Sequence, residues 1–222
     1  SLFPLVVYGP FGTGKTESMA QSAMALIEEK PRSRVLICTL SNSAADLYIL
    51  RHFQHRSSIK FRRVVYTKRW VKTVDPVVRK FCFMTEDCGG FVLPRREQLM
   101  DCQIVVTTLS MAMELVGLKL TGHFTHIMID EAAQALECEA LVPLLLASVK
   151  TCVVLAGDAM QMRPRVYSEE AQRQLFQRSL LERLYRHYEE HRAHASSASA
   201  FPSLLLRENY RTDHRILTFI SE

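Results

Sequence analysis

Short apolar runs rich in β-branched residues recur along the chain, and stretches with apolar residues at helical spacing lie between them. The runs predict strands at Leu5–Tyr8, Val35–Cys38, Val64–Tyr66, Ile104–Thr107, His126–Ile129, Cys152–Ala156 and Leu204–Leu206. Several runs are apolar at nearly every position, which favours strands that are covered on both faces. The pattern therefore predicts an α/β fold, with a mostly parallel sheet and helices on both of its faces.

The intervening segments differ in how clearly they predict helices. Apolar residues after Gly14 keep helical spacing until Pro31, which ends that helix, and a second helix is expected to begin after Ser43, a favourable N-cap residue. Residues 56–100 contain several Pro and Gly and show poor periodicity, so we expect an irregular basic insertion there. Residues 193–200 predict a surface loop, and we find no internal repeat.

Length and composition exclude several classes of protein. The chain has 222 residues, 48% hydrophobic and 23% charged, which excludes disorder, collagen and coiled coil as overall classes. No apolar run approaches the ~20 residues needed to span a bilayer, so we expect no membrane partner. Six cysteines without a C-x-x-C pair favour reduced, buried thiols over a disulfide framework or a zinc site. The chain starts in a strand-like run and stops within an apolar pattern, so we expect a piece of a longer intracellular protein.

The positive charge is concentrated in one stretch. Residues 51–80 hold ten Lys and Arg against one acidic residue, interleaved with Phe53, Phe61, Tyr66 and Trp70. This composition fits a surface that meets a phosphate backbone and stacks on bases, and it fits equally a solvated face whose aromatics lie in the core. In the first interpretation the contacts to nucleic acid include Arg62, Arg63, Lys68 and Arg69.

The strongest chemical signal is the phosphate-binding pattern G-x-x-x-x-G-K-T, which lies between a predicted strand and a predicted helix. Its glycines allow a tight turn that directs backbone N–H groups at phosphate oxygens, and the following helix adds its positive end. Lys15 would reach the β- and γ-phosphates of a nucleotide, and Thr16 would place its hydroxyl on Mg²⁺. The predicted nucleotide-binding residues of this loop are Gly9, Pro10, Gly12, Thr13, Gly14, Lys15 and Thr16.

Acidic and polar side chains follow two other predicted strands. Asp130 and Glu131 come directly after an apolar strand, where Asp130 suits the Mg²⁺ shell and Glu131 suits the orientation and deprotonation of an attacking water. Two acids after a strand are also common at an ordinary helix N-terminus, but their pairing with the phosphate-binding loop favours catalysis. Gln161, after the strand that ends near Gly157, could sense the γ-phosphate or hold the water; by itself it indicates only a turn.

Taken in order, these segments resemble a known family. The resemblance rests on Gly9–Thr16, Ser41–Asp46, Val106–Thr108, Asp130–Gln134, Gly157–Pro164 and Glu208–Arg211. The set is similar to the motifs of superfamily 1 helicases of the Upf-type branch. More narrowly, the helicase-with-zinc-finger proteins, the second paralogue among them, are resembled in Leu36–Thr39, Ser41–Ile49, Arg69–Val74, Asp130 and Glu137–Glu139. The likeness covers essentially the whole chain.

The resemblance implies a RecA-like P-loop NTPase domain, the first of two, that uses ATP and Mg²⁺. It implies that Gln161 couples the γ-phosphate to nucleic acid, that Tyr210 stacks on the adenine, that Arg211 reaches the γ-phosphate, and that the single strand is held by Asn42, Thr107 and Thr108. Phe11, Met162-Arg163 and Asn209 depart from the usual residues, and Asn209 puts positioning or base contact in question.

The resemblance also implies the function. It is ATP hydrolysis coupled to translocation along single-stranded nucleic acid, with RNA favoured, and with a second RecA-like domain supplying an arginine finger. A lone first domain would then be nearly inactive. The implied parent protein has zinc fingers, a second helicase module and a ribonuclease II-like domain, and acts in nucleus and cytoplasm.

An alternative of a different class is a transcriptional coactivator scaffold that binds nuclear receptors and has a secondary ATP site. Leu141–Leu145 matches the L-x-x-L-L docking motif. We expect Leu144–Leu146 to be the core face and Pro143 to disturb a docked helix, and burial of Leu141 and Leu145 would exclude docking.

Overall fold

One seven-stranded sheet forms the centre of the molecule. The computed structural model describes residues 3–158, 160, 162–192 and 202–211. The strand order is β3-β4-β2-β5-β6-β1-β7, and every pairing is parallel, which confirms the predicted α/β class. The strands are β1 (Leu5–Tyr8), β2 (Val35–Thr39), β3 (Phe61–Arg63), β4 (Ile104–Thr108), β5 (His126–Ile129), β6 (Cys152–Gly157) and β7 (Ser203–Leu205).

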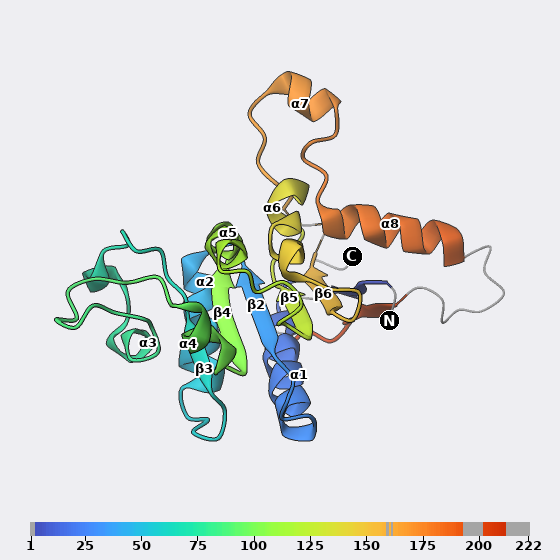
Figure 1. The fold of residues 1–222 in the computed structure, drawn as a ribbon. Coiled ribbons are helices and arrows are strands. Elements are labelled where there is room, and N and C mark those ends of the chain that lie inside the picture. Colours follow the sequence, from blue (N-terminus) through green and yellow to red (C-terminus); the bar gives the residue numbers. More distant parts are fainter. Residues whose placement is uncertain (1–2, 159, 161, 193–201, 212–222) are drawn as a thin grey trace.

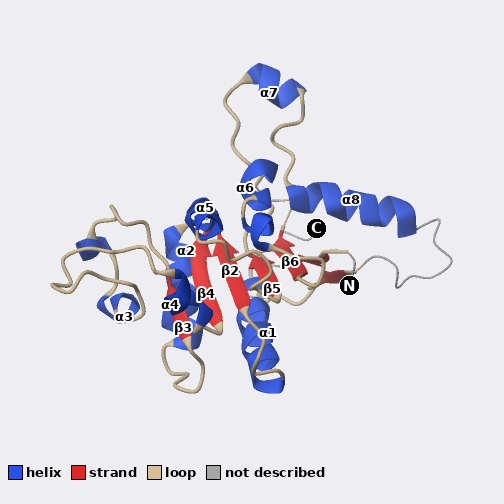
Figure 2. Ribbon diagram, in the orientation of Figure 1, coloured by secondary structure: helices blue, strands red, loops and turns tan. Residues whose placement is uncertain are grey.

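Helices cover both faces of the sheet (Figure 2), because alternate strand residues point to opposite sides. In β2, Leu36 packs into one apolar cluster and Ile37 into the other. One cluster includes residues of α1 (Lys15–Glu29), α2 (Asn42–Leu47), the π-helix η1 (Tyr48–Phe53) and α3 (Pro76–Arg79). The other includes residues of α4 (Arg96–Met100), α5 (Leu109–Gly117), α6 (Glu137–Leu141), the 3₁₀ helix η3 (Pro143–Leu146) and α8 (Leu180–Arg192).

Two segments project from this core in Figure 1. One lies beyond β3 and contains the 3₁₀ helix η2 (Val71–Thr73) and α3, and the other contains α7 (Glu169–Arg173). Within the described residues no helix has both the length and the apolar character needed to cross a membrane. The predicted loop at 193–200 lies outside the described residues.

The strand predicted at Val64–Tyr66 is wrong by three residues, because the paired strand is β3. Phe61 and Arg63 both point into the interior, and Arg63 is fully buried. A charged residue at a buried position interrupts the apolar run that marks a strand in the sequence. The predicted irregular insertion at 56–100 therefore contains the edge strand of the sheet, and only the segments around that strand are irregular.

The second helix begins earlier than predicted. Ser41, not Ser43, is its N-cap residue, and its Oγ accepts a hydrogen bond of 3.1 Å from the backbone N–H of Ala44. The helix then continues from α2 into η1, a π-helical turn of a kind that is frequent at functional sites.

The cysteines follow the prediction only in part. Every cysteine is a free thiol, and Cys38 and Cys102 are buried. Cys88 and Cys138 are exposed, and Cys82 and Cys152 are partly buried.

Candidate functional site: a nucleotide pocket at the carboxyl ends of the strands

The loop between β1 and α1 has the backbone of a phosphate cradle. Gly12 and Gly14 adopt positive φ angles of 75° and 79°, which side chains other than glycine rarely tolerate. A Cβ at Gly9 would stand 2.6 Å from Thr13 Oγ1, a hydroxyl that donates to the carbonyl of Pro10 at 2.7 Å. The loop ends at the N-terminus of α1, where unpaired N–H groups and the helix dipole favour an anion.

Lys15 is directed back onto this loop. Its Nζ donates to the carbonyl oxygens of Gly9 at 2.7 Å and of Pro10 at 2.9 Å. Burial lowers the pKa of Lys15, while the carboxylates of Asp158 and Asp130 act in the opposite direction. Neutral carbonyls are weak partners for an ammonium group, so a phosphate in the cradle would form the stronger, charge-assisted bond.

Thr16 and Asp130 meet across the site. Thr16 Oγ1 donates to Asp130 Oδ2 at 2.7 Å, and Asp130 is 2% exposed. The same carboxylate oxygen accepts a hydrogen bond of 2.9 Å from the hydroxyl of Tyr48, which is fully buried on η1. A carboxylate and a hydroxyl side by side are the hard oxygen donors that suit Mg²⁺, so the residues fit the predicted ion. Nothing in the sequence marks Tyr48 as part of this site.

Glu131 occupies a strained position next to Asp130. Its φ is 58°, in the left-handed region, and its backbone N–H donates to Asp130 Oδ1 at 2.9 Å. Burial raises the pKa of Glu131, and the neighbouring charge of Asp130 raises it further. A carboxylate with a raised pKa is a better proton acceptor, which suits a general base. Strain of this kind at a non-glycine residue is common at functional sites.

The segment after β7 closes the pocket from the other side. Because β7 pairs with β1, it brings Tyr210 and Arg211 over the phosphate cradle. The backbone N–H of Tyr210 donates to the carbonyl of Gly12 at 2.9 Å, and Asn209 Nδ2 donates to the carbonyl of Phe11 at 2.8 Å. Asn209 Oδ1 also accepts from the N–H of Arg211 at 2.9 Å, so Asn209 fits a positioning role. Tyr210 is 76% exposed, which leaves its ring accessible to a base.

These elements enclose a cavity of about 780 Å³. Several predicted nucleotide-site residues line it, namely Gly12, Thr13, Gly14, Lys15, Thr16, Asp130, Glu131, Tyr210 and Arg211. Sequence reasoning missed Arg51, His52 and Glu17, which also line it. His52 Nδ1 lies 3.4 Å from Glu17 Oε2, and burial lowers the pKa of His52. The predicted residue Gln161 lies outside the described residues.

Comparison with known proteins identifies the family of this fold and site. The AAA domain family matches residues 4–88 and 92–169, which is most of the chain. This chain belongs to the AAA domain family. Relatives of this AAA domain confirm the predicted resemblance to helicases.

Curated relatives include two that are 44% identical to the chain and come from different proteins. They are "Probable helicase with zinc finger domain" of Mus musculus, over 99% of the chain and 11% of the relative, and "3'-5' exoribonuclease HELZ2" of Homo sapiens, over 98% and 8%. The chain is 34% identical to "RNA helicase Mov10l1" of Mus musculus, over 98% of the chain and 18% of that protein. The AAA domain thus spans about a tenth of the length of the first relatives.

A solved structure shares the fold. It is that of arterivirus nonstructural protein 10, a helicase, in complex with DNA. The match has a TM-score of 0.53 and 18% identity, and it covers 98% of this chain and 39% of that protein.

The residues predicted to hold single-stranded nucleic acid are Asn42, Thr107 and Thr108. All three lie at the carboxyl ends of the β-strands, as the nucleotide pocket does, but Thr107 and Thr108 face the interior. Thr107 is fully buried, and its hydroxyl donates to the carbonyl of Val64 at 3.1 Å. Thr108 is 4% exposed, and its Oγ1 lies 3.2 Å from Ser110 Oγ. Their hydroxyls are therefore engaged within the protein. Asn42 lies at the start of α2, where its Oδ1 accepts a hydrogen bond of 2.8 Å from Arg63.

The four predicted basic contacts separate in space. Arg63 was predicted to meet nucleic acid, and this is wrong because its guanidinium is fully buried against Asp46 Oδ1, at 3.0 Å from Nε. Arg69 is mostly buried and bonds the other oxygen of Asp46 at 2.9 Å. Arg62 and Lys68 are exposed, but Lys68 follows β3 on the side of the nucleotide pocket, and Arg62 lines a different cavity.

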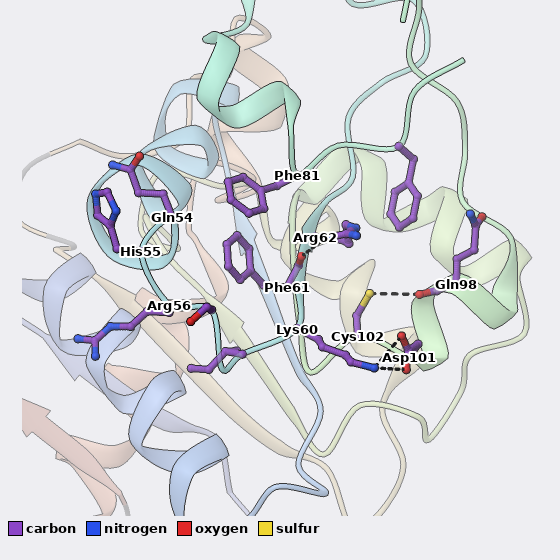
Figure 3. Close-up of a pocket in the computed structure, with 13 residues that line it drawn as sticks. Gln54, His55, Arg56, Lys60, Phe61, Arg62, Phe81, Gln98, Asp101 and Cys102 are labelled. Carbon is purple, nitrogen blue, oxygen red and sulfur yellow. Dashed lines mark hydrogen bonds and ion pairs between the residues drawn. The ribbon is translucent and has the colours of Figure 1, made fainter. Parts of the chain in front are cut away.

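That second cavity, of about 640 Å³, opens where β3 and β4 begin (Figure 3). Phe61 and Phe81 stack at 4.5 Å between ring centroids, and Lys60 bonds Asp101 at 3.0 Å. In parallel strands the beginning and the end lie at opposite edges of the sheet, so this cavity is remote from the phosphate cradle.

The L-x-x-L-L segment differs from its prediction. Leu146 is fully buried and Leu144 packs against the same core cluster, but Leu145 is 56% exposed, so the predicted core face is right only in part. Leu141 is 44% exposed, so burial of Leu141 and Leu145 does not exclude docking. However, α6 ends at Leu141 and η3 begins at Pro143, so the segment is not one continuous helix. Docking into a groove requires an unbroken amphipathic helix, and none of these relatives has a name that points to a receptor. The coactivator alternative gains no support.

Proposed function

We propose that this AAA domain binds and hydrolyses ATP and couples hydrolysis to movement along single-stranded nucleic acid, with RNA as the preferred strand. The observation that carries the proposal is the contact between Thr16 and Asp130, with Glu131 beside it in the cavity that holds Lys15 and Arg211. A phosphate cradle alone binds nucleotides. A cradle joined to an oxygen-donor pair and a half-buried general base can also hydrolyse them.

The residues of the site have different roles in the proposed reaction. Lys15 and Arg211 hold the phosphates and stabilise the negative charge that develops on them. Glu131, with Gln161, orients a water whose oxygen bonds to the γ-phosphorus as the bond to the β,γ-bridging oxygen breaks. Glu131 accepts the proton that the water loses, and ADP leaves with the charge of the broken bond. Mg²⁺ bound by Thr16 and Asp130 would neutralise phosphate charge.

Tyr210 would stack on the adenine, since its ring is exposed at the cavity and its backbone is anchored on Gly12. The preference for RNA is supported by the names of relatives, an RNA helicase and an exoribonuclease. We further propose a second RecA-like domain as the partner that supplies an arginine finger, typically worth about 10³–10⁵ in rate. We also propose a multidomain parent with zinc fingers, in line with the name of one relative, and action of that parent in nucleus and cytoplasm.

The test is the ATPase rate of the intact parent protein with poly-U, with single-stranded DNA and without nucleic acid. We expect stimulation by both strands, and more by poly-U. A Lys15→Ala parent provides the blank for contaminating ATPases. A rate that does not respond to either strand would contradict the coupling, and a rate equal to that of the Lys15→Ala blank would contradict hydrolysis at this site.

A further inference from the structure

Two large aromatic side chains stand out of the loop that follows β3. Trp70 is 70% exposed and Tyr66 is 48% exposed. The other two aromatics of the basic stretch, Phe53 and Phe61, are buried in the core. Packing of the core therefore explains Phe53 and Phe61 but not Trp70 and Tyr66, and exposed aromatic rings within a basic stretch are the side chains on which single-stranded nucleic acids stack their bases.

The loop that carries Trp70 is held firmly. The backbone N–H and the hydroxyl of Thr73 donate to the carbonyl of Trp70 at 3.0 and 2.7 Å. Arg69, next to Trp70, is tied to Asp46 at 2.9 Å, and Val74 is 2% exposed within the core. A ring on such a support loses little entropy when a ligand stacks on it.

This loop lies on the proposed path of the strand. The loop follows the carboxyl end of β3, and Asn42 follows the carboxyl end of β2. Because the strands are parallel, both lie at the same end of the sheet. Arg63 donates both to Asp46 and to Asn42, at 3.0 and 2.8 Å. Asp46 also binds Arg69, at 2.9 Å. Direct contacts therefore run from Asn42 through Arg63, Asp46 and Arg69 to the position next to Trp70.

Charge decides which partner suits the ring. Between 66 and 74 the loop carries Lys68, Arg69 and Lys72 and no acidic residue. Lys72 Nζ lies 6.0 Å from the centroid of the Trp70 ring. A polyanion with flat aromatic groups satisfies both features, because phosphates pair with the lysines and a base covers the ring. An apolar protein surface would leave the lysines without partners.

We propose that Trp70 is a stacking site for a base of the bound single strand, that Tyr66 adds a second aromatic surface beside it, and that Lys68 and Lys72 bind the adjoining phosphates. The proposal rests on the proposed function and adds to it the residues that hold the strand beyond Asn42. Stacking tolerates any base, so the site would give affinity with little sequence preference.

Trp70 is the single tryptophan of the chain, so emission excited at a wavelength that tyrosine does not absorb reports on this ring alone in the 222-residue chain. We expect poly-U to quench the emission in a saturable way. An abasic oligomer of equal length, which keeps the phosphates and lacks the bases, should bind more weakly and leave the emission nearly unchanged. Binding of both oligomers is measured independently by anisotropy of a label on the oligomer.

Substitution separates stacking from charge. We expect Trp70→Ala to weaken binding of labelled poly-U at least about five-fold without changing the slope of affinity against salt, because no charge is removed. Trp70→Phe should restore most of the affinity, since it restores a ring. The matched control is Tyr167→Ala, because Tyr167 is 88% exposed on the segment leading to α7. This control should bind as the wild-type chain does.

The outcomes distinguish this inference from the function on which it rests. If anisotropy shows no binding of poly-U, nucleic-acid binding by the domain is wrong and the stacking site falls with it. If poly-U binds but emission does not change, or changes equally with the abasic oligomer, the strand passes elsewhere and only the stacking site is wrong. Equal losses of affinity in Trp70→Ala and Tyr167→Ala would also overturn it.

Discussion

At the scale of single residues, one carboxylate organises the nucleotide pocket. Asp130 is almost fully buried, and three groups donate to it: the hydroxyls of Thr16 and Tyr48 and the backbone N–H of Glu131. A buried carboxylate with this many donors is fixed in orientation. Asp130 therefore holds Thr16, the other proposed Mg²⁺ ligand, and Glu131, the proposed base, in one rigid unit. Tyr48 acts as a positioning residue within that unit.

Replacing Tyr48 by Phe tests this arrangement. The change removes only the hydroxyl, and groups that orient a metal ligand are typically worth 10–100-fold in metal affinity. We expect the Mg²⁺ concentration for half-maximal binding of a fluorescent ATP analogue to rise about ten-fold, with binding in EDTA unchanged. Tyr188→Phe is the matched control, because Tyr188 is another buried tyrosine, whose hydroxyl donates to Pro4 at 2.8 Å. Equal Mg²⁺ requirements in both variants would contradict the role of Tyr48.

The roles of Lys15 and Glu131 predict opposite defects in the intact parent. Lys15→Ala should lose nucleotide binding, because Lys15 would contact phosphates already in the ground state. Glu131→Gln should bind ATP normally and stop turnover, because Glu131 acts on the water in the transition state. Equilibrium binding and steady-state turnover, measured on both variants, separate the two roles. An equal loss of ATP affinity in both would refute this assignment.

At the scale of elements, the edge strand β3 depends on one buried ion pair. Arg63 lies on β3 and binds Asp46 and Asn42 of α2, so it joins the edge of the sheet to the helix above it. Burial lowers the pKa of Arg63, and the neighbouring carboxylate of Asp46 opposes that effect. Arg63 thus supports, from inside the protein, the surface near Asn42 where single-stranded nucleic acid is proposed to bind.

We expect Arg63→Ala to lower the free energy of unfolding by about 3 kcal/mol, because it removes a main partner of Asp46 and leaves part of a buried charge uncompensated. The neighbouring variant Arg62→Ala removes the same kind of side chain from an exposed position and should change stability by less than about 0.5 kcal/mol. Urea unfolding of both variants gives the comparison. Similar midpoints would contradict a structural role for Arg63.

Strand β3 is also the element that the sequence predicts least accurately. Periodicity locates β1 and β5 to the residue, because their apolar runs are uninterrupted. It misplaces β3, because a buried Arg63 is indistinguishable from a surface arginine until its partner Asp46 is seen beside it. The phosphate cradle and its acids were predictable because their chemistry fixes their spacing. Tyr48 was not, since a buried tyrosine within an apolar helical stretch fits no catalytic or binding motif and is indistinguishable from a core residue until Asp130 is seen beside it.

At the scale of the whole molecule, the basic stretch at residues 51–80 reaches both the amino ends and the carboxyl ends of the strands. Lys68 and Lys72 follow the carboxyl end of β3, the end of the strands at which the nucleotide pocket lies. Arg56 and Arg62 line the cavity where β3 begins. All four side chains are exposed. A strand on the proposed path would therefore meet the first pair and miss the second, although the sequence shows one continuous run of positive charge.

Two double variants that remove equal charge test this division. Removing one lysine–phosphate ion pair should lower the slope of log K against log salt for a single strand by about 0.7. We expect Lys68→Gln with Lys72→Gln to lower the slope by about 1.4 and to weaken poly-U binding at low salt. Arg56→Gln with Arg62→Gln should leave both unchanged, and neither pair should alter ATP binding, because none of the four residues lines the nucleotide pocket. If the Arg pair lowers the slope instead, the strand runs past the cavity in Figure 3, and the path over Asn42 and Trp70 is wrong.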